Sequence, residues 1–226
     1  MRIYFVRHGQ TDSNLLDALD TDIPGAALNG QGRAQAAALP GHWRDLGLPR
    51  LDGIVTSPLL RTRQTAAALA AAHGLVPVID RGVREVRAGD LEMLYVADAP
   101  STYLAVVADW LHGKRDRRMP GGESGYQVIG RVNAALRRAA QRWGEEAAVA
   151  VVAHGCLIRY ATASLVEGIS PELAMSQPLR NCSITAVEGT PEQGWSARMY
   201  SSKPIDEWEV PDEVNSFRRS IQVLRG

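Results

Sequence analysis

The sequence predicts an α/β fold with three layers, α/β/α, in which helices cover both faces of a mostly parallel central sheet. Short apolar runs alternate with longer segments of helical pattern, as strands and crossover helices do in such folds. The apolar runs hold hydrophobic residues at consecutive positions, which is typical of strands buried on both faces. The chain has 226 residues, 45% hydrophobic and 22% charged, and we expect a single globular domain over residues 1–226.

The apolar runs that we predict to be strands are residues 3–6, 53–55, 76–79, 148–153, 183–187 and 197–200. The last two are spaced for a hairpin that turns between Gly189 and Gly194. Beyond them the chain is charged and weakly patterned, so we expect residues 201–226 to form a C-terminal appendage.

The segments that we predict to be helices are residues 32–46, 61–73, 101–111, 126–143 and 159–167. The fourth has the clearest pattern, because Val128, Val132 and Leu136 recur at helical spacing and form one apolar stripe. Arg131 and Arg138 lie off this stripe and are expected to face water.

The charge balance limits the classes of partner. Lysine and arginine together number 25, as do aspartate and glutamate, so the formal net charge is zero. No bulk field therefore favours nucleic acid or an anionic membrane, and neither is expected as a partner. Any site for an anion must be local.

The cysteines predict a reducing compartment. Cys156 and Cys182 are the only two, and their spacing suits neither a disulfide scaffold nor a structural metal.

No apolar run approaches the roughly 20 residues of a membrane span, and the start of the chain lacks the pattern of a secretion signal. We therefore expect a cytoplasmic protein.

Polar side chains follow the ends of several predicted strands. Arg7 and His8 come after the first strand, Arg61 after the second and His154 after the strand 148–153. Because parallel strands end at one edge of a sheet, these side chains are expected to lie together. Glu85 follows the remaining parallel strand by a short turn.

Such a cluster suits phosphoryl transfer. The transition state spreads negative charge over three oxygens, which the guanidinium groups of Arg7 and Arg61 can hold by paired hydrogen bonds. The same cations favour a neutral imidazole, the form in which His8 can attack phosphorus. A departing alkoxide needs a proton, for which Glu85 is the candidate donor.

Six motifs carry a family resemblance, in the order Arg-His-Gly-Gln-Thr at residues 7–11, then residues 28–36, 56–66, 84–85, 121–124 and 151–155. Together they resemble the histidine phosphatase superfamily, in the branch related to cofactor-dependent phosphoglycerate mutase. The motifs span residues 1 to about 160 in the family's order, which makes the resemblance specific. The resemblance implies a phosphoglycerate-mutase-like fold.

The resemblance also implies roles for individual residues. His8 would be the phosphorylated nucleophile and Glu85 the proton donor. The phosphoryl oxygens would be held by Arg7, Asn14, Arg61 and His154. It further implies no metal and no other cofactor, a phosphohistidine hydrolysed by water, and a small phosphorylated metabolite as substrate.

Two departures from the family pattern concern the substrate side. Where the family commonly has an aromatic residue followed by Trp-Glu-Gly, residues 88–93 keep Gly89 and Glu92 but lack the tryptophan and the second glycine. The long charged segment of the mutases is not recognisable before residues 121–124. We therefore favour hydrolysis over isomerisation.

Other functions stay open at this point. A phosphoglycerate-type mutase would return the phosphoryl group to its substrate, and a noncatalytic protein would only bind phosphorylated ligands. A metal hydrolase using His8 and His154 has no carboxylate pattern to support it. Pairing through the C-terminal strands would give a homodimer.

Two charged segments also have alternative interpretations. Glu85 stands between Arg84 and Arg87, which would lower its pKa if they formed a structural ion pair with it. The basic run 112–118 is either a solvated loop or a lid whose arginines meet a second anionic group of the substrate.

Overall fold

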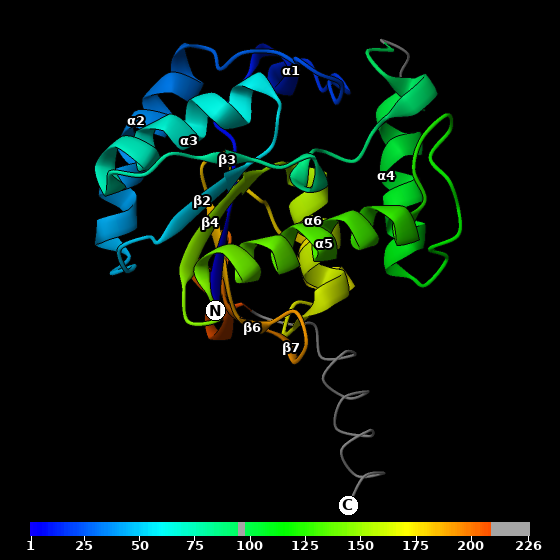
Figure 1. Cartoon of the computed structure of the whole chain (residues 1–226). Helices are drawn as coiled ribbons and strands as arrows, with labels where there is room; N and C mark the ends of the chain where they lie inside the picture. The colour runs from blue at the N-terminus through cyan, green and yellow to red at the C-terminus, as the bar shows by residue number, and fades with distance from the viewer. Residues whose placement is uncertain (95–97, 209–226) are drawn as a thin grey trace, which may run out of the picture.

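A mixed sheet of eight strands forms the middle layer of the protein, whose computed structural model describes residues 1–94 and 98–208 (Figure 1). The strands lie in the order β3, β2, β4, β1, β6, β7, β5, with β8 paired to β7. Their bounds are β1 (Arg2–Arg7), β2 (Gly53–Thr56), β3 (Val78–Ile79), β4 (Ala148–Ala153), β5 (Val166–Glu167), β6 (Ile184–Thr190), β7 (Gly194–Tyr200) and β8 (Lys203–Pro204).

The first half of this order is parallel, and the second half is largely antiparallel. β3, β2, β4 and β1 pair in parallel, whereas β6 runs antiparallel to β1 and forms the predicted hairpin with β7. The prediction for residues 76–79 was too long, since only Val78 and Ile79 pair and Val76 is 87% exposed. Pro77 lies between Val76 and the paired residues, and it has no N–H to donate to a strand ladder.

Helices cover both faces of the sheet, as predicted. One face carries α2 (Gly30–Asp45) and α3 (Leu60–His73), and the other carries α5 (Gly125–Trp143) and α6 (Gly155–Leu165), with α4 (Asp98–Leu111) packed on α6 (Figure 1). The short helices are α1 (Asp12–Leu15), α7 (Pro171–Ser176), η1 (Arg81–Val83), η2 (Gly89–Leu91) and η3 (Ile205–Glu207). None of the helices described here combines the length and the apolar character needed to cross a membrane.

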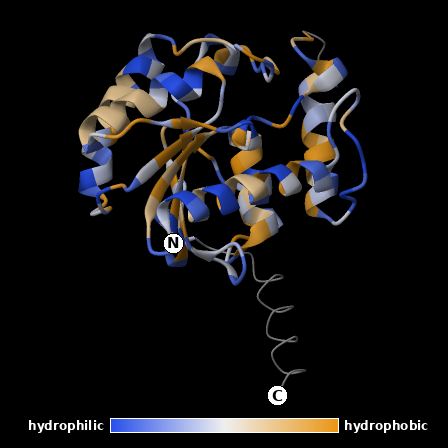
Figure 2. Cartoon of the chain, viewed as in Figure 1, coloured by the Kyte–Doolittle hydropathy of each residue, from blue (hydrophilic) through white to orange (hydrophobic). Residues whose placement is uncertain are grey.

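Alternate residues of the central strands face opposite helical layers. Tyr4 and Val6 belong to the core under α2 and α3, while Ile3 and Phe5 belong to the core under α5 and α6. All four are buried, and the sheet interior is apolar in Figure 2. Burial on both faces explains the uninterrupted apolar runs of the sequence.

The expected C-terminal appendage is only partly described. After β7 the chain turns at Ser201 and Ser202, adds β8 to the sheet edge and ends its described part with η3. Residues 209–226, the rest of the expected appendage, lie outside the described residues.

Helix α6 begins four residues before the predicted start. The prediction placed it at residues 159–167, whereas it spans Gly155–Leu165. Two free N–H groups in the first turn of the helix, those of Cys156 and Leu157, donate to the carboxylate of Glu85. This long-range cap satisfies the helix start, and no local sequence pattern reveals it.

The prediction that Arg131 faces water was wrong. Its side chain is only 14% exposed and forms an ion pair with Glu123 at 2.9 Å. The guanidinium also donates to the carbonyls of Gly82, Arg84 and Glu85, so it fixes the backbone that carries Glu85. Arg138 does lie largely in water, 53% exposed, with its ion pair to Asp80.

The packing of α5 on β2 gives a stability prediction. A Cβ added at Gly53 would lie 2.3 Å from the ring of Trp143, at the end of α5. We expect Gly53→Ala to lower the free energy of unfolding by about 1–3 kcal/mol, because the buried ring must shift. Denaturant unfolding measures this change.

Gly130→Ala is the matched control, because Gly130 is exposed within α5 and a Cβ there meets nothing within 4 Å. It should raise the free energy of unfolding by about 1 kcal/mol through helix propensity. If Gly53→Ala were as stable as Gly130→Ala, the described packing of Trp143 on β2 would be wrong.

Candidate active site

A cavity of about 820 Å³ opens at the carboxyl ends of the parallel strands. Its lining includes five of the predicted site residues, Arg7, His8, Asn14, Arg61 and Glu85. The sixth, His154, is fully buried beside the cavity, with its ring centroid 5.3 Å from that of His8. The structure therefore brings together side chains that are far apart in the sequence.

Hydrogen bonds select one tautomer of His8. Nδ1 lies 2.7 Å from the carbonyl oxygen of Gly9, which can only accept, so Nδ1 carries the proton. Nε2 accepts a hydrogen bond from Nε of Arg61 at 3.1 Å. The lone pair of His8 Nε2 therefore faces the guanidinium of Arg61, which the sequence predicts to lie beside it.

His8 is held in its neutral form. Burial lowers its pKa well below the ordinary value of a histidine, and the charges of Arg61 and Arg7 lower it further. The backbone is fixed as well, because Asn181 donates from Nδ2 to the carbonyl of His8 at 2.9 Å. A neutral imidazole with an oriented lone pair is a nucleophile at neutral pH.

Ser57 orients His154 from the end of β2. Ser57 Oγ lies 2.8 Å from Nε2 of His154 and accepts the N–H of Leu59 at 3.4 Å. The hydroxyl of Ser57 can then donate to Nε2 of His154. Because Nε2 accepts this hydrogen bond, the ring proton of the neutral His154 lies on Nδ1. Burial and the nearby charge of Arg61 lower the pKa of His154 well below its ordinary value.

Two buried nitrogens of the cluster have no hydrogen-bond partner within residues 1–94 and 98–208. They are Nε of Arg7 and Nδ1 of His154. An unmet buried donor costs about 1–3 kcal/mol, more when it is charged. The arrangement therefore favours a ligand that brings acceptors, and an anion suits the cation of Arg7.

Arg7 is anchored at its other end. Nη1 donates to the carbonyl of Leu179, and the start of α6 lies against the guanidinium. A Cβ at Gly155 would lie 3.4 Å from Nε of Arg7. Because glycine has no side chain, this position leaves room for an acceptor beside the Nε–H donor.

Asn14 is oriented by the capping box of α1. Its Oδ1 accepts from the backbone N–H of Thr11 at 3.1 Å and from Nδ2 of Asn181 at 3.4 Å. The amide oxygen is thus occupied, which leaves the NH₂ group as a donor to the cavity that Asn14 lines.

Glu85 is buried at the start of α6. Its carboxylate accepts from the backbone N–H groups of Val86, Leu157 and Cys156 at 2.9, 2.8 and 3.2 Å. Burial nevertheless raises the pKa of Glu85, although these N–H groups and the charge of Arg61 act in the opposite direction. The carboxyl group is thus biased toward its protonated form.

The flanking arginines do not pair with Glu85. Arg84 donates to Glu123 at 3.1 Å, and Arg87 donates to Asp22 at 3.2 Å. Arg84 and Arg87 therefore form their ion pairs with Glu123 and Asp22 and not with Glu85. The alternative in which they lower the pKa of Glu85 through a structural ion pair does not hold.

Asp20 is a site residue that sequence reasoning missed. Its carboxylate lies 3.5 Å from Nη1 of Arg61, and its carbonyl accepts from Nη2 at 2.7 Å. Ser13 and the N–H of Ala26 also donate to the carboxylate. Asp20 thereby holds the guanidinium in place, and because it lies in a loop, no periodicity or strand end marked it.

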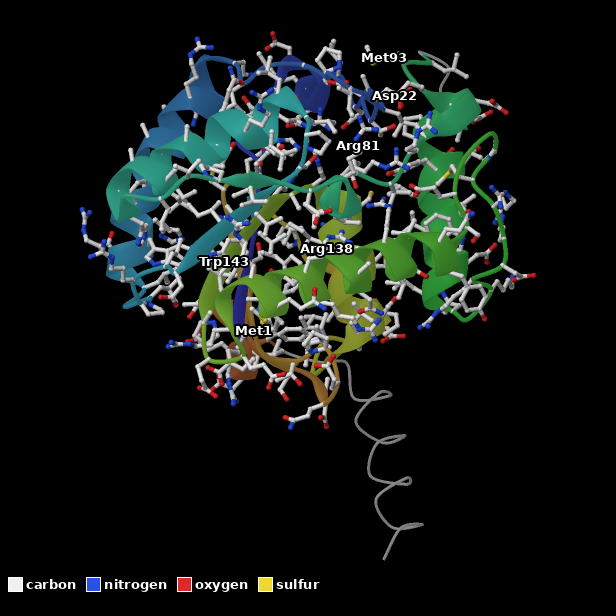
Figure 3. All side chains as sticks on the ribbon, in the orientation of Figure 1. Met1, Asp22, Arg81, Met93, Arg138 and Trp143 are labelled. Atoms are coloured by element: carbon white, nitrogen blue, oxygen red, sulfur yellow. The ribbon has the colours of Figure 1, made fainter. Side chains whose placement is uncertain are left out.

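Glu92 fastens the same loop. Its carboxylate accepts from the backbone N–H and the hydroxyl of Thr21 and from the N–H of Asp22. Asp22 and Met93 lie at the same end of the molecule in Figure 3, where Met93 donates to the carbonyl of Leu19. The retained glutamate of residues 88–93 thus contacts the loop that lines the cavity.

The basic run 112–118 lies away from the cavity. Lys114 and Arg117 both form ion pairs with Asp109 of α4, and Arg118 donates to the carbonyl of Gly122. None of these side chains lines the cavity. The solvated-loop interpretation fits this arrangement, and the lid interpretation stays a prediction.

The described residues hold no cluster of three or more histidine, cysteine, aspartate or glutamate side chains that could bind a metal ion. Both cysteines, Cys156 and Cys182, are free.

Comparison with known proteins shows the family of this chain. Residues 3–202 match the histidine phosphatase superfamily (branch 1). The chain belongs to this superfamily. The match covers nearly all of the described sheet and every residue of the cluster, so it agrees with the resemblance drawn from the motifs.

Relatives in the superfamily include phosphatases and mutases by name. A probable phosphoglycerate mutase GpmB of Shigella boydii is 31% identical, over 83% of this chain and 85% of the relative. A PE-PGRS family protein of Mycobacterium tuberculosis is also 31% identical over 92% of this chain, which spans only 38% of that relative. A mycobacterial glucosyl-3-phosphoglycerate phosphatase structure has a TM-score of 0.70 at 29% identity, covering 88% of this chain and 98% of the other.

The protonation state of His8 can be measured directly. At a pH of about 6.5, where an ordinary histidine is half protonated, we expect His8 to be neutral with its proton on Nδ1. The lowered pKa and the hydrogen bond to Gly9 are the reasons. Nitrogen-15 NMR of the imidazole reports both properties, and a His8 ring half protonated at this pH would contradict the described electrostatics.

Proposed function

We propose that this chain is a metal-independent phosphomonoesterase that hydrolyses a small phosphorylated metabolite through a phosphohistidine on His8. The observation that carries the proposal is the pair of unpartnered buried donors, Nε of Arg7 and Nδ1 of His154, beside the lone pair of His8 Nε2. A phosphoryl group supplies the acceptors that these donors lack and places its phosphorus near the nucleophile.

In the first step, Nε2 of His8 attacks phosphorus and the bond from phosphorus to the ester oxygen breaks. Attack requires Arg61 to turn its Nε–H from the lone pair of His8 to a phosphoryl oxygen. The arginines stabilise the charge on the equatorial oxygens, and Glu85 gives its proton to the departing alkoxide.

In the second step, water attacks the phosphorus of phosphohistidine. The carboxylate of Glu85, now ionised, accepts a proton from this water, and the bond from Nε2 to phosphorus breaks. Inorganic phosphate is released, and His8 and Glu85 return to their starting protonation states. Two properties support Glu85 in this exchange, namely its place in the cavity lining and its raised pKa.

A mutase is the second candidate, because the GpmB relatives carry that name. It would share the first step and then return the phosphoryl group to another hydroxyl of the bound molecule. The two functions separate on one experiment with purified protein and a panel of phosphorylated metabolites, in which a phosphatase releases inorganic phosphate and forms no isomer. A noncatalytic binding protein would bind members of the panel and turn over none.

We also propose a cellular location and an oligomeric state for the enzyme. Two free cysteines are consistent with a cytoplasmic location. A homodimer that pairs through its C-terminal strands stays a prediction, and size-exclusion chromatography with light scattering would test it.

The nucleophile has a direct test. His8→Ala should abolish release of phosphate from every ester in the panel, because the variant lacks the ring nitrogen that attacks phosphorus in the proposed mechanism. The exposed His112 provides the control, since His112→Ala removes an imidazole outside the cavity lining. Steady turnover by His8→Ala comparable with that of His112→Ala would overturn the mechanism.

The proton donor has a test that depends on the leaving group and on pH. Glu85→Gln should slow hydrolysis of alkyl phosphates by about 10²–10⁴-fold and affect p-nitrophenyl phosphate much less, because nitrophenolate leaves without a proton. Equal losses on both substrates would count against Glu85 as the acid.

The sign of the pH effect follows from the raised pKa of Glu85. The acid form is lost as pH rises through that pKa, so kcat for alkyl phosphates should fall on the alkaline side. The lowered pKa of His8 puts the acidic limb below the ordinary histidine range. In Glu85→Gln the alkaline limb should vanish, and its persistence would assign that limb to another group.

A further inference from the structure

The cavity is larger than the proposed phosphoryl site needs. Its volume is about 820 Å³, and beyond the cluster around His8 its lining includes Leu19, Pro100, Leu104 and Arg159, which we call the outer wall. The phosphoryl group would occupy the inner end, so the rest of the metabolite must face this wall. Arg159 is the only cation on the wall beyond Arg7 and Arg61 in the described lining.

Arg159 is anchored on one side of its guanidinium. It lies on α6, and its Nη1 donates to the backbone carbonyls of Ala174 and Gln177 at the end of α7. Both acceptors are neutral, so these bonds hold the side chain without cancelling its charge. The guanidinium is therefore fixed in position and remains a cation at the cavity wall.

The other edge of the guanidinium is open. In the described part of the chain, Nε and Nη2 of Arg159 make no hydrogen bond, and no aspartate or glutamate pairs with this arginine. The edge formed by Nε and Nη2 is the one that holds a carboxylate through two parallel hydrogen bonds. Half-burial of the side chain reduces the screening of such a pair.

The acids of the cavity lining lie elsewhere. Asp20 pairs with Arg61, and Glu85 is capped by the N–H groups at the start of α6. Asp17 lies in the loop after α1 and is exposed, whereas Arg159 lies on α6. The charged groups of the lining outside the cluster are thus the cation of Arg159 and the carboxylate of Asp17. The cation favours an anionic group of the substrate on the α6 side of the cavity.

We propose that Arg159 binds a carboxylate of the substrate, so that the preferred substrates are phosphomonoesters that also carry a carboxylic acid. This inference rests on the proposed function, because it assigns the far end of the molecule whose phosphoryl group meets His8. Arg159 then sets specificity and takes no part in bond breaking.

A matched pair of substrates isolates the carboxylate. 3-Phosphoglycerate and glycerol 3-phosphate have the same carbon chain and the same ester, and differ in a carboxylate against a hydroxymethyl group. The wild-type protein should show a kcat/KM about tenfold or more higher for 3-phosphoglycerate, as a charge-assisted pair predicts. In Arg159→Gln this preference should fall to about twofold or less, mainly through a higher KM for 3-phosphoglycerate.

Two further variants distinguish recognition from folding. Arg159→Lys keeps the charge and a donor for the α7 carbonyls but loses the paired edge, so it should keep part of the preference. Arg118→Gln makes the same change at an exposed arginine outside the cavity, and it should keep the whole preference. A wild-type preference that survives in Arg159→Gln would overturn the inference, as would equal losses on both substrates.

The results also separate this inference from the proposed function. Wild-type protein that hydrolyses p-nitrophenyl phosphate and both esters at equal kcat/KM would remove the carboxylate site and leave the phosphomonoesterase standing. Wild-type protein that hydrolyses none of the three would overturn both.

Discussion

The hydrogen bond from Arg61 to the unprotonated Nε2 of His8 is the interaction on which the rest of the site depends. It joins a permanent cation to a lone pair, so it forms only while the imidazole is neutral. The carbonyl of Gly9 completes the selection by accepting a hydrogen bond from the N–H at Nδ1. His8 directly follows β1 and Arg61 follows β2, and these two strands flank β4, with which each pairs in parallel. The environment of the proposed nucleophile thus depends on strand order as much as on residue type.

Burial then determines which partners the cluster requires. Asp20 satisfies Arg61, but Nε of Arg7 and Nδ1 of His154 are buried without acceptors in the described part of the protein. A phosphoryl dianion supplies both acceptors and the missing negative charge, and it also favours the protonated form of Glu85 through like-charge repulsion. In the proposed mechanism, binding would therefore favour the acid form of Glu85 at the same time as it aligns the phosphorus. The electrostatic features of the site all act on one ligand.

Much of this arrangement could be predicted from the sequence, for a physical reason. Apolar runs buried on both faces mark the parallel strands. Polar residues at the carboxyl ends of these strands lie together because the strands end at the same edge of the sheet. The residues that escaped prediction act through long-range contacts from loops. Asp20 reaches Arg61 from the loop after α1, Glu85 caps N–H groups of α6 that lie 71 and 72 residues later in the chain, and Arg131 is buried by carbonyls of the turn before Glu85. Ser57 stands inside a recognised motif, yet its role became clear only from its contact with His154.

The central claim is that the phosphoryl group passes through Nε2 of His8. The most direct measurement is mass spectrometry of protein quenched with alkali during turnover of a good substrate, followed by mapping of the modified peptide. The account predicts an acid-labile, alkali-stable phosphoryl group on His8, present during turnover and absent once substrate is exhausted. Phosphate release with an unmodified His8 at every time point, under quenching that preserves a phosphohistidine standard, would contradict it.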